Sequence, residues 1–510
     1  MKTSPHPQPK DRCSPSALKV RQLRKLRRYL RRSVAPFSAH YGELFRKVGF
    51  DPGQLREWDD LQRIPMSGKA DFSASPDAVR RFVLVPDRAV LARRPSTIVR
   101  ALFRGKNAAA RGLEREFRPL LMTSTTGRSA DPVPFLYTAH DIANLAAAGD
   151  FVMRVCAADR DDRMMNLFPF APHLAFWVTH YAGTEFGVSM VSTGGGKTMG
   201  TGGNLRLMKR LAPNVLIGMP TFLYHLLKTA ADEGLELPGL KKIVLGGEKA
   251  PVGIRRRLRR LAARLGAPEI DVLSTYGFTE AKLAWTECPC PQGAASPGYH
   301  LTPDLGIIEI IDPVSGEPMG EGEPGEIVFT PLDARGSVVL RYRTGDVIDG
   351  GLVYEPCPCC GRSVPRLVGG ISRLSEVREM RLDKLKGTLV DFNLLERLLD
   401  DTAKVGTWQL ELRKRHDDPL ETDEIHLHVE RLDGVDEPAA RRELETLFAS
   451  RTEIRPNAIH FHDNETMREL QGVGRELKES RIVDHRPPAN GTPPATPQPR
   501  EMVATTGEEA

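Results

Sequence analysis

Apolar residues recur every three or four positions in two strongly basic segments, residues 16–37 and 252–265. This spacing predicts two helices, each with an apolar stripe that packs on the protein and a charged remainder that faces solvent. Neither segment carries aromatic stacking residues or a groove-reading motif, which argues against nucleic-acid binding. The stripes are Leu23, Leu26, Leu30 and Val34 in the first helix and Ile254, Leu258, Leu261 and Leu265 in the second.

The rest of the pattern predicts an α/β large N-terminal domain followed by a small α+β C-terminal domain. From residue 136 to 277, helical patterns alternate with short apolar runs such as 215–219 and 243–245, as expected where helices cover a sheet. Beyond residue 376 the pattern changes to separate strands around one helix. Strands are expected at 409–412, 425–429 and 458–461, and the helix near 438–448.

The expected boundaries are a disordered N-terminus at 1–15, an N-terminal domain over 16–373, a C-terminal domain over 374–486 and a disordered tail at 487–510. The first fifteen residues are polar and lack the apolar core of a secretory signal. The apolar stretch 178–191 is interrupted by polar residues, so no membrane span is predicted. We therefore expect a cytoplasmic protein. A net charge of +6 over 510 residues fits an anionic substrate and a solvated surface equally well.

A polar loop over residues 123–129 has the composition of a phosphate-binding turn. It holds five hydroxyl side chains, a glycine and Arg128. Backbone N–H groups and hydroxyls donate to phosphate oxygens, and glycine permits close approach. An ordinary Ser/Thr-rich loop has the same composition. The later run Gly194 to Thr198 is not a Walker A loop, because that motif needs glycine where Val191 stands, so a glycine-rich turn before a helix is expected there.

Four further segments give the polar loop a context: residues 245–248 (Leu-Gly-Gly-Glu), 274–280 (Ser-Thr-Tyr-Gly-Phe-Thr-Glu), 341–346 (Arg-Tyr-Arg-Thr-Gly-Asp) and 477–484 (Leu-Lys-Glu-Ser-Arg-Ile-Val-Asp). Together, and in this order, they resemble the adenylate-forming superfamily. The opening part, through residues 63–72, is similar to that of phenylacetate-CoA ligases. The resemblance spans roughly residues 16–486.

The resemblance implies that ATP and Mg²⁺ bind to these motifs. The loop from Thr123 would hold the phosphates, Gly247 and Tyr276 would flank the adenine, and Asp346 would accept hydrogen bonds from the ribose. Glu280 would hold magnesium, a cation that prefers oxygen ligands. The alternative for Asp346 is a capped turn. The implied residues are Thr123, Ser124, Thr125, Thr126 and Gly127 in the loop, followed by Gly247, Glu248, Tyr276, Thr279 at the α-phosphate, Glu280, Asp346 and Arg373 beside the ribose.

The resemblance also assigns Lys478 as the catalytic lysine. A carboxylate attacking the α-phosphate is repelled until a cation bridges the two groups. A solvated lysine is the alternative. In the family the C-terminal domain moves between an adenylation pose and a thiol-transfer pose, so a hinge is expected near residues 373–376.

Two departures from the family pattern concern the loops. Ser124 stands where the family usually has glycine, and serine tolerates positive φ poorly. The stretch from Glu376 to Leu385, before Lys386, is longer than usual. We expect these departures to bear on thiol delivery more than on adenylation.

Five of the seven cysteines fall in two tight groups, which favours a metal site over disulfides in a large chain without a signal peptide. Cys357 and Cys360 have zinc-knuckle spacing, and Cys288 and His300 can complete a tetrahedral structural Zn²⁺ site, with Cys359 as an alternate ligand. Relatives of the phenylacetate-CoA ligases carry a comparable cluster. The alternative is a reduced cysteine-rich loop without metal. The histidine pairs 426/428 and 460/462 alternate with apolar residues, so we expect them to point to solvent without binding metal.

The expected reaction is ATP-dependent activation of a small carboxylic acid to an acyl adenylate, followed by transfer to coenzyme A. An acyl carrier protein as acceptor and a decayed, zinc-containing binding protein are the alternatives. The resemblance places the acyl pocket at Phe168, Phe170, His173, Trp177 and residues 218–221. These aromatics suit an aryl acid, although a medium-chain acid or plain core packing fits as well.

Overall fold

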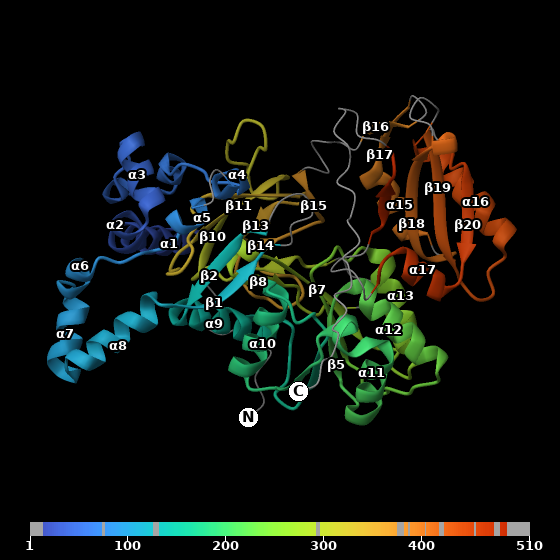
Figure 1. Ribbon diagram of the computed structural model, residues 1–510, viewed down its shortest axis with the longest axis horizontal. Helices are drawn as coiled ribbons and strands as arrows, with labels where there is room; N and C mark the ends of the chain where they lie inside the picture. Colours follow the sequence, from blue (N-terminus) through green and yellow to red (C-terminus); the bar gives the residue numbers. More distant parts are fainter. Residues whose placement is uncertain are drawn as a thin grey trace, which may run out of the picture. The chain divides into compact units, whose positions relative to one another are not determined.

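The computed structural model describes residues 14–73, 77–125, 132–291, 296–374, 382–385, 388–402, 404–417, 423–452, 455–473 and 480–486. The chain divides into two compact units (Figure 1). Residues 1–381 with 472–479 form the first, and residues 382–471 with 480–510 form the second. Within the described part, no helix is long and apolar enough to cross a membrane. The two terminal segments for which disorder is expected lie almost entirely outside the described residues.

A nine-stranded sheet forms the centre of the first unit. Its strands are β3 (Arg163–Asn166), β4 (Ser189–Ser192), β5 (Val215–Gly218), β6 (Lys242–Leu245), β7 (Asp271–Phe278), β8 (Leu283–Thr286), β9 (Tyr299–His300), β13 (Leu352–Val353) and β14 (Arg366–Leu367). They lie in the order β13-β14-β9-β8-β7-β6-β5-β3-β4, and the strands from β7 to β4 are parallel. Parallel strands bring their carboxyl ends to one edge, where α/β proteins bind ligands.

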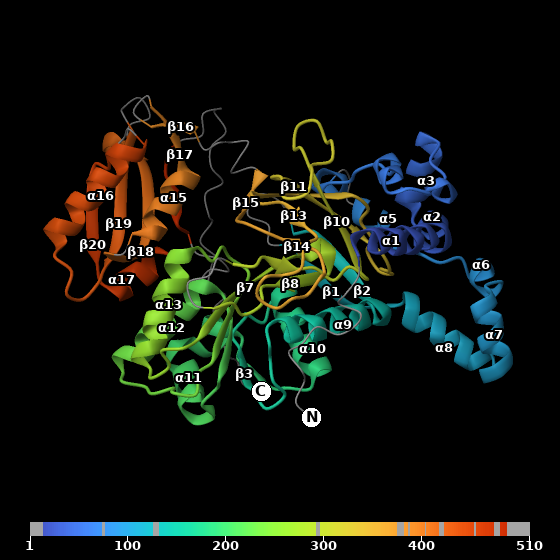
Figure 2. The ribbon, with the colours of Figure 1, turned by 180° about the vertical axis from the view of Figure 1, so that it is seen from behind.

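Helices cover both faces of the parallel strands (Figures 1 and 2). They are α9 (Ala139–Val155), α10 (Leu174–Phe186), α11 (Gly195–Leu211), α12 (Pro220–Asp232) and α13 (Val252–Arg264). Leu216 and Ile243 pack with residues of α11 to α13, whereas Ile217 and Val244 pack with residues of α9 and α10. Burial on both faces explains why these strands are continuous apolar runs. The predicted α/β fold of this unit is confirmed.

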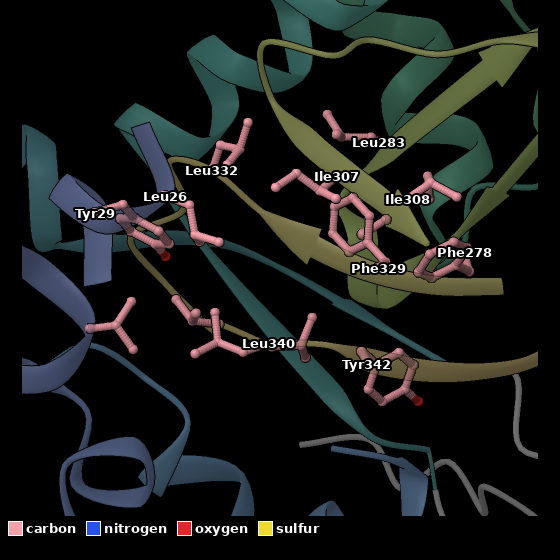
Figure 3. Packing of buried hydrophobic residues seen from close by; sticks show 14 of the residues in the cluster. Leu26, Tyr29, Phe278, Leu283, Ile307, Ile308, Phe329, Leu332, Leu340 and Tyr342 are labelled. Carbon is pink, nitrogen blue, oxygen red and sulfur yellow. The ribbon is translucent and has the colours of Figure 1, made fainter. Parts of the chain in front are cut away.

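A second, antiparallel sheet carries two of the predicted site residues. It consists of β10 (Gly306–Ile311), β11 (Gly325–Pro331), β12 (Tyr342–Ile348) and β15 (Ile371–Arg373), in that order. A separate hairpin joins β1 (Pro119–Ser124) to β2 (Pro134–Thr138). Side chains from β10, β11 and β12 meet Phe278 of β7 and Leu283 of β8 in one apolar core (Figure 3). This core holds the two sheets in a fixed relation.

The first predicted helix is one helical run made of α1 (Pro15–Tyr29), a π-helical turn η2 (Leu30–Val34) and α2 (Ala35–Phe37). Its predicted stripe is buried in the same core, and its arginines at 24, 28, 31 and 32 are exposed. The remaining elements of this region are α3 (Ala39–Val48), η3 (Pro52–Gln54), η4 (Trp58–Arg63), α4 (Lys69–Ser73), α5 (Ala78–Arg81), α6 (Arg88–Ala92), α7 (Pro95–Arg104) and α8 (Lys106–Phe117).

The second basic helix is α13, and the expectation that its charged face is simply solvated is wrong for one turn. Arg255 makes a two-point ion pair with Glu287, with Nη1 to Oε2 at 2.6 Å and Nη2 to Oε1 at 3.1 Å. Glu287 is 3% exposed and also accepts a hydrogen bond from the backbone N–H of Ser274. A carboxylate this deeply buried needs a paired cation, and the bidentate arginine supplies it.

The second unit is the predicted α+β fold. Its elements are β16 (Leu382–Leu385), β17 (Thr388–Asp391), α15 (Phe392–Asp401), β18 (Val405–Lys414), η6 (Arg415–Asp417), β19 (Asp423–Arg431), α16 (Glu437–Thr452), β20 (Ala458–His462), α17 (Asn464–Leu470) and β21 (Ile482–Asp484). The main sheet has the order β20-β19-β18-β21. Alternate residues of its strands form a core with leucines of α15 and with Leu444 and Phe448 of α16.

Phe329 on β11 offers a test of the shared core, because it is fully buried and packs edge-on against Phe278 and Trp285. Phe329→Ala is expected to lower the free energy of unfolding by about 3–5 kcal/mol, since it removes buried apolar surface and leaves a cavity. The measurement is urea denaturation followed by far-UV circular dichroism. Val314→Ala is the matched control, because Val314 is 83% exposed. Equal midpoints for the two variants would contradict this account of the core.

Candidate active site

Three predicted residues meet where β7, β12 and β15 come together. The hydroxyl of Tyr276 donates to Oδ2 of Asp346 at 2.8 Å, and Nε of Arg373 lies 3.0 Å from Oδ1. Asp346 is 5% exposed, and Arg373 is its direct partner in the β12–β15 ladder. Burial, reinforced by the Asp346 charge, raises the pKa of Tyr276 well above its usual value. The carboxyl group therefore lies between a neutral phenol and a guanidinium.

A bulge in β12 aims the Asp346 side chain. The register between β11 and β12 shifts within residues 343–347, and Gly345 has a φ of +70°, which a residue with a side chain adopts poorly. The hydroxyl of Thr344 accepts from the backbone N–H of Asp346 at 3.0 Å. Glu326 on β11 accepts from the Nε of Arg343 at 2.9 Å and from the N–H of Gly345. The Thr-Gly-Asp motif therefore encodes a backbone shape and a carboxylate together.

Glu280, expected to bind magnesium, lies in the short helix η5 (Thr279–Ala281) directly after β7. Its Oε1 accepts a hydrogen bond of 2.8 Å from the hydroxyl of Tyr342. Burial raises the pKa of Glu280, and the Tyr342 hydrogen bond only partly offsets this effect. Tyr342 is a site residue that the sequence reasoning did not single out, although it lies inside the 341–346 motif.

The turn after β6 places Gly247 and Glu248 at the same edge of the sheet. Gly247 has a φ of +80°, and the side chains nearest to this turn are those of Met219, Phe168 and Thr275. A side chain at position 246 would collide with Thr275, so that position also requires glycine. Oε2 of Glu248 accepts from the hydroxyl of Thr221 at 3.0 Å. The turn thus lies against residues predicted to line the acyl pocket.

The predicted phosphate loop begins at the end of β1. Thr123 and Ser124 are the last residues of that strand, and the N–H of Thr125 bonds the carbonyl of Val133. Ser124 does not adopt positive φ, so its replacement of glycine imposes no backbone strain. Its carbonyl lies 3.1 Å from Nδ1 of His173, which ties the loop to the predicted acyl pocket. Thr126 and Gly127 lie outside the described residues.

Lys478 also lies outside the described residues, and so does most of the expected hinge after Leu374. The residues that follow Lys478 are described. Arg481 Nη1 lies 3.0 Å from Oδ1 of Asp400, and its guanidinium stacks on Trp408. Strand β21 then pairs in parallel with β18. The 477–484 motif is therefore anchored at its end in the core of the second unit.

Four of the cysteine and histidine residues expected to bind zinc converge in the first unit. One ligand atom from each of Cys288, His300, Cys357 and Cys360 lies within 4.8 Å of all the others. Sγ of Cys288 and Cys357 are 3.7 Å apart, and Cys360 Sγ lies 3.3 Å from Nε2 of His300. The other nitrogen of His300 lies 3.3 Å from the carbonyl of Thr286, which orients the ring.

Hydrogen bonds within this cluster shift the pKa values of its thiols in opposite directions. The Cys288 and Cys360 side chains lower the pKa of Cys357, and hydrogen bonding to Cys357 and Cys360 raises the pKa of Cys288. Cys359 does not join the four residues. It forms a disulfide with Cys290, so these two surplus cysteines are paired with each other.

Comparison with known proteins indicates the class of enzyme. The family of AMP-binding enzymes matches residues 130–331. The phenylacetate-coenzyme A ligase of Pseudomonas putida is 24% identical over 66% of this chain and 68% of its own length, and that of Thermus thermophilus is 25% identical over 74% and 75%. This chain thus contains an AMP-binding enzyme domain and is similar to phenylacetate-coenzyme A ligases over most of its length. It is an AMP-forming acid–thiol ligase.

The fold agrees as well. A 2-hydroxyisobutyryl-CoA ligase in its postadenylation state superimposes with a TM-score of 0.72 at 18% identity, covering 95% of this chain and 93% of that one. At this identity the likeness concerns the fold alone. It places the ligase in an architecture of one large and one small unit, as the sequence pattern predicts.

The pKa of Glu280 leads to a test of the site. The folded-state pKa is raised above 4.5, so the stabilising form is the protonated one, and its contribution is lost as pH rises through the folded-state pKa. Glu280→Gln should therefore be more stable than the native ligase at neutral pH, by a margin that grows as the pH rises above 4.5. Urea denaturation of both proteins at several pH values checks this. A margin independent of pH would disprove it.

Proposed function

We propose that this ligase uses ATP and Mg²⁺ to convert a small aromatic carboxylic acid into an acyl adenylate and then transfers the acyl group to coenzyme A. The observation that carries the proposal is the convergence of Tyr276, Asp346 and Arg373 beside Glu280 at the carboxyl edge of the parallel strands. The names of the relatives, which are phenylacetate-coenzyme A ligases, support the aromatic acid and the acceptor.

The arrangement suits a nucleotide. Asp346 carries an ionised carboxylate that can accept from two ribose hydroxyls. The phenol of Tyr276 and the positive-φ turn at Gly247, which has no side chain, suit the two sides of a flat adenine ring. The hydroxyls of Thr123, Ser124 and Thr125, with the assigned Thr126 and Gly127, would donate to phosphate oxygens.

The first step joins the acid to AMP. A carboxylate oxygen of the acid attacks the α-phosphorus, the bond from that phosphorus to the bridging oxygen breaks, and pyrophosphate leaves. Negative charge accumulates on both reacting groups, and Lys478 with the hydroxyl of Thr279 is proposed to neutralise it. In the second step the thiolate sulfur of coenzyme A attacks the acyl carbon, and AMP leaves with the electron pair of the broken bond.

Glu280 is the proposed magnesium ligand. Its carboxylate is partly buried, accepts one hydrogen bond from Tyr342 and has a raised pKa, which are the properties of an oxygen ligand whose charge needs a cation. When bound, Mg²⁺ supplies charge neutralisation to the polyphosphate. Tyr342 orients the carboxylate for this contact.

The acyl pocket is proposed at the aromatic residues after β3 and on α10. The ring centroids of Phe170 and Phe176 are 5.1 Å apart, as are those of Phe176 and Trp177. Phe168 lies against the Gly246–Gly247 turn. The indole N–H of Trp177 is buried and has no acceptor among the described residues, so it is available to a polar group of the substrate. An aryl ring fits such a surface by stacking.

Pyrophosphate release over a panel of aryl and aliphatic acids tests the reaction, with and without coenzyme A. We expect release to depend on an aryl acid and to fall by about 10²–10³ in Lys478→Ala, the loss typical of one transition-state charge contact. Lys404→Ala is the control, because Lys404 is a surface lysine paired with Glu443 in the second unit. Lys478→Ala supplied with a synthetic acyl adenylate should still form the thioester, which shows that the variant is folded. Absence of pyrophosphate release with every acid of the panel, or transfer of the acyl group only to an acyl carrier protein, would overturn the proposal.

We also propose a structural zinc ion at the cysteine cluster. Three thiol sulfurs and one imidazole nitrogen within 4.8 Å of one another are the number and kind of donors that structural zinc takes, and the His300 ring is already oriented by Thr286. The double variant Cys357→Ser, Cys360→Ser should lose about one zinc per chain by elemental analysis. Cys156→Ala should retain it, because Cys156 lies buried in a different apolar cluster. Equal zinc in both variants would exclude the site.

A further inference from the structure

Four histidines form a ladder on one face of the second unit's sheet. His426 and His428 alternate along β19, and His460 and His462 alternate along β20. The expectation that they simply point to solvent is wrong, since the side chains of His426 and His428 are only 10% and 13% exposed. The imidazole rings stack on one another. For example, the ring centroids of His428 and His460 are 4.8 Å apart with nearly parallel planes.

The imidazole nitrogens of the ladder meet in two pairs. Nδ1 of His426 lies 3.1 Å from Nε2 of His460, and Nδ1 of His428 lies 2.9 Å from Nε2 of His462. Nitrogens this close can share one hydrogen bond or one metal ion. Two ligands 2.9 Å apart, each at a bond length of about 2.0–2.1 Å, subtend about a right angle at the metal, as neighbouring ligands do in square-planar or octahedral coordination.

Each pair has a carboxylate behind it. Nε2 of His428 lies 3.1 Å from Oε2 of Glu411, and Nε2 of His426 lies 3.2 Å from Oε2 of Glu424. A carboxylate in this position accepts the proton on Nε2 and leaves a lone pair on Nδ1. Metal-binding histidines in proteins are commonly backed in this way, because the carboxylate fixes the tautomer and the ring orientation.

The hydrogen-bond pattern can exchange its bridging proton for a cation without a net change in protonation. In the tautomer of His428 whose Nε2–H is donated to Glu411, Nδ1 of His428 accepts a hydrogen bond from Nε2–H of His462. When the proton of His462 moves from Nε2 to its own Nδ1, both facing nitrogens carry lone pairs.

We propose that the histidine ladder is a binding site for a divalent transition-metal ion, with His428 Nδ1 and His462 Nε2 as the first pair to bind it. Imidazole ligands suit Zn²⁺, Ni²⁺ and Cu²⁺, whereas Mg²⁺ and Ca²⁺ prefer oxygen. Water or small anions complete the coordination.

Neighbouring charges favour this pair over the other. Glu424, behind His426, already faces Arg413 at 3.6 Å and Arg415 at 3.9 Å. Glu411, behind His428, faces the imidazole of His485 at 3.6 Å and the more distant Arg413 charge. Asp463 also adds negative charge beside His462. A cation at the His428–His462 pair therefore meets less repulsion.

The test is Ni²⁺ binding to the full-length chain without an affinity tag. The protein is first loaded with Zn²⁺ and dialysed against citrate, so that the cysteine cluster stays occupied while weaker sites are emptied. Isothermal titration calorimetry should then detect Ni²⁺ uptake. His428→Gln and His462→Gln are each expected to weaken it at least tenfold. His416→Gln is the matched control, because His416 lies on η6, outside the ladder, and should leave the affinity unchanged.

A second measurement keeps the outcome clear if a variant folds poorly. Cu²⁺ added to the same zinc-loaded native protein should give an electron paramagnetic resonance spectrum with coupling to imidazole nitrogens. No Ni²⁺ uptake by the native chain, equal uptake by the ladder variants, or a Cu²⁺ spectrum without nitrogen coupling would each overturn the proposal. None of these results depends on whether the ligase reaction is assigned correctly.

Discussion

A carboxylate that is almost fully buried must be compensated by nearby charge and hydrogen bonds, and Asp346 imposes this requirement on two distant parts of the chain. Tyr276 comes from the last parallel strand and Arg373 from the end of the antiparallel sheet, while the Thr344 hydroxyl holds the backbone N–H of Asp346 within the bulge. Loss of Tyr276 or Arg373 would leave an ion in a medium of low dielectric constant, at a cost of several kcal/mol. This cluster therefore helps to hold the two sheets in register.

The same reasoning applies to Glu280, the proposed magnesium ligand. A protein selected for stability alone would not keep a carboxylate where burial disfavours its charge. Residues of this kind persist where a ligand supplies the missing charge. Tyr342 holds the side chain in place until then, and its own phenol stays neutral because burial and the Glu280 charge both raise its pKa.

The fold and the motifs that bring Tyr276, Asp346 and Arg373 together could be predicted because they are encoded locally. Helical and strand periodicities identified both units, and the motif around Asp346 includes the threonine and glycine that shape its bulge. What could not be predicted depends on contacts between distant segments. The Arg255–Glu287 pair joins a helix to the end of a strand, and no local pattern signals it. The histidine faces followed from alternation, but their pairing depends on the parallel register between β19 and β20.

The cysteine region has a consequence for the unfolded chain. The disulfide between Cys290 and Cys359 joins residues 69 positions apart. The loop that it closes contains all of β10, β11 and β12, and with them Tyr342 and Asp346. Closing a loop of this length removes about 4 kcal/mol of conformational entropy from the unfolded state. The segment that carries Asp346 is therefore restricted before it folds, and an oxidising environment favours assembly of the Tyr276–Asp346–Arg373 cluster.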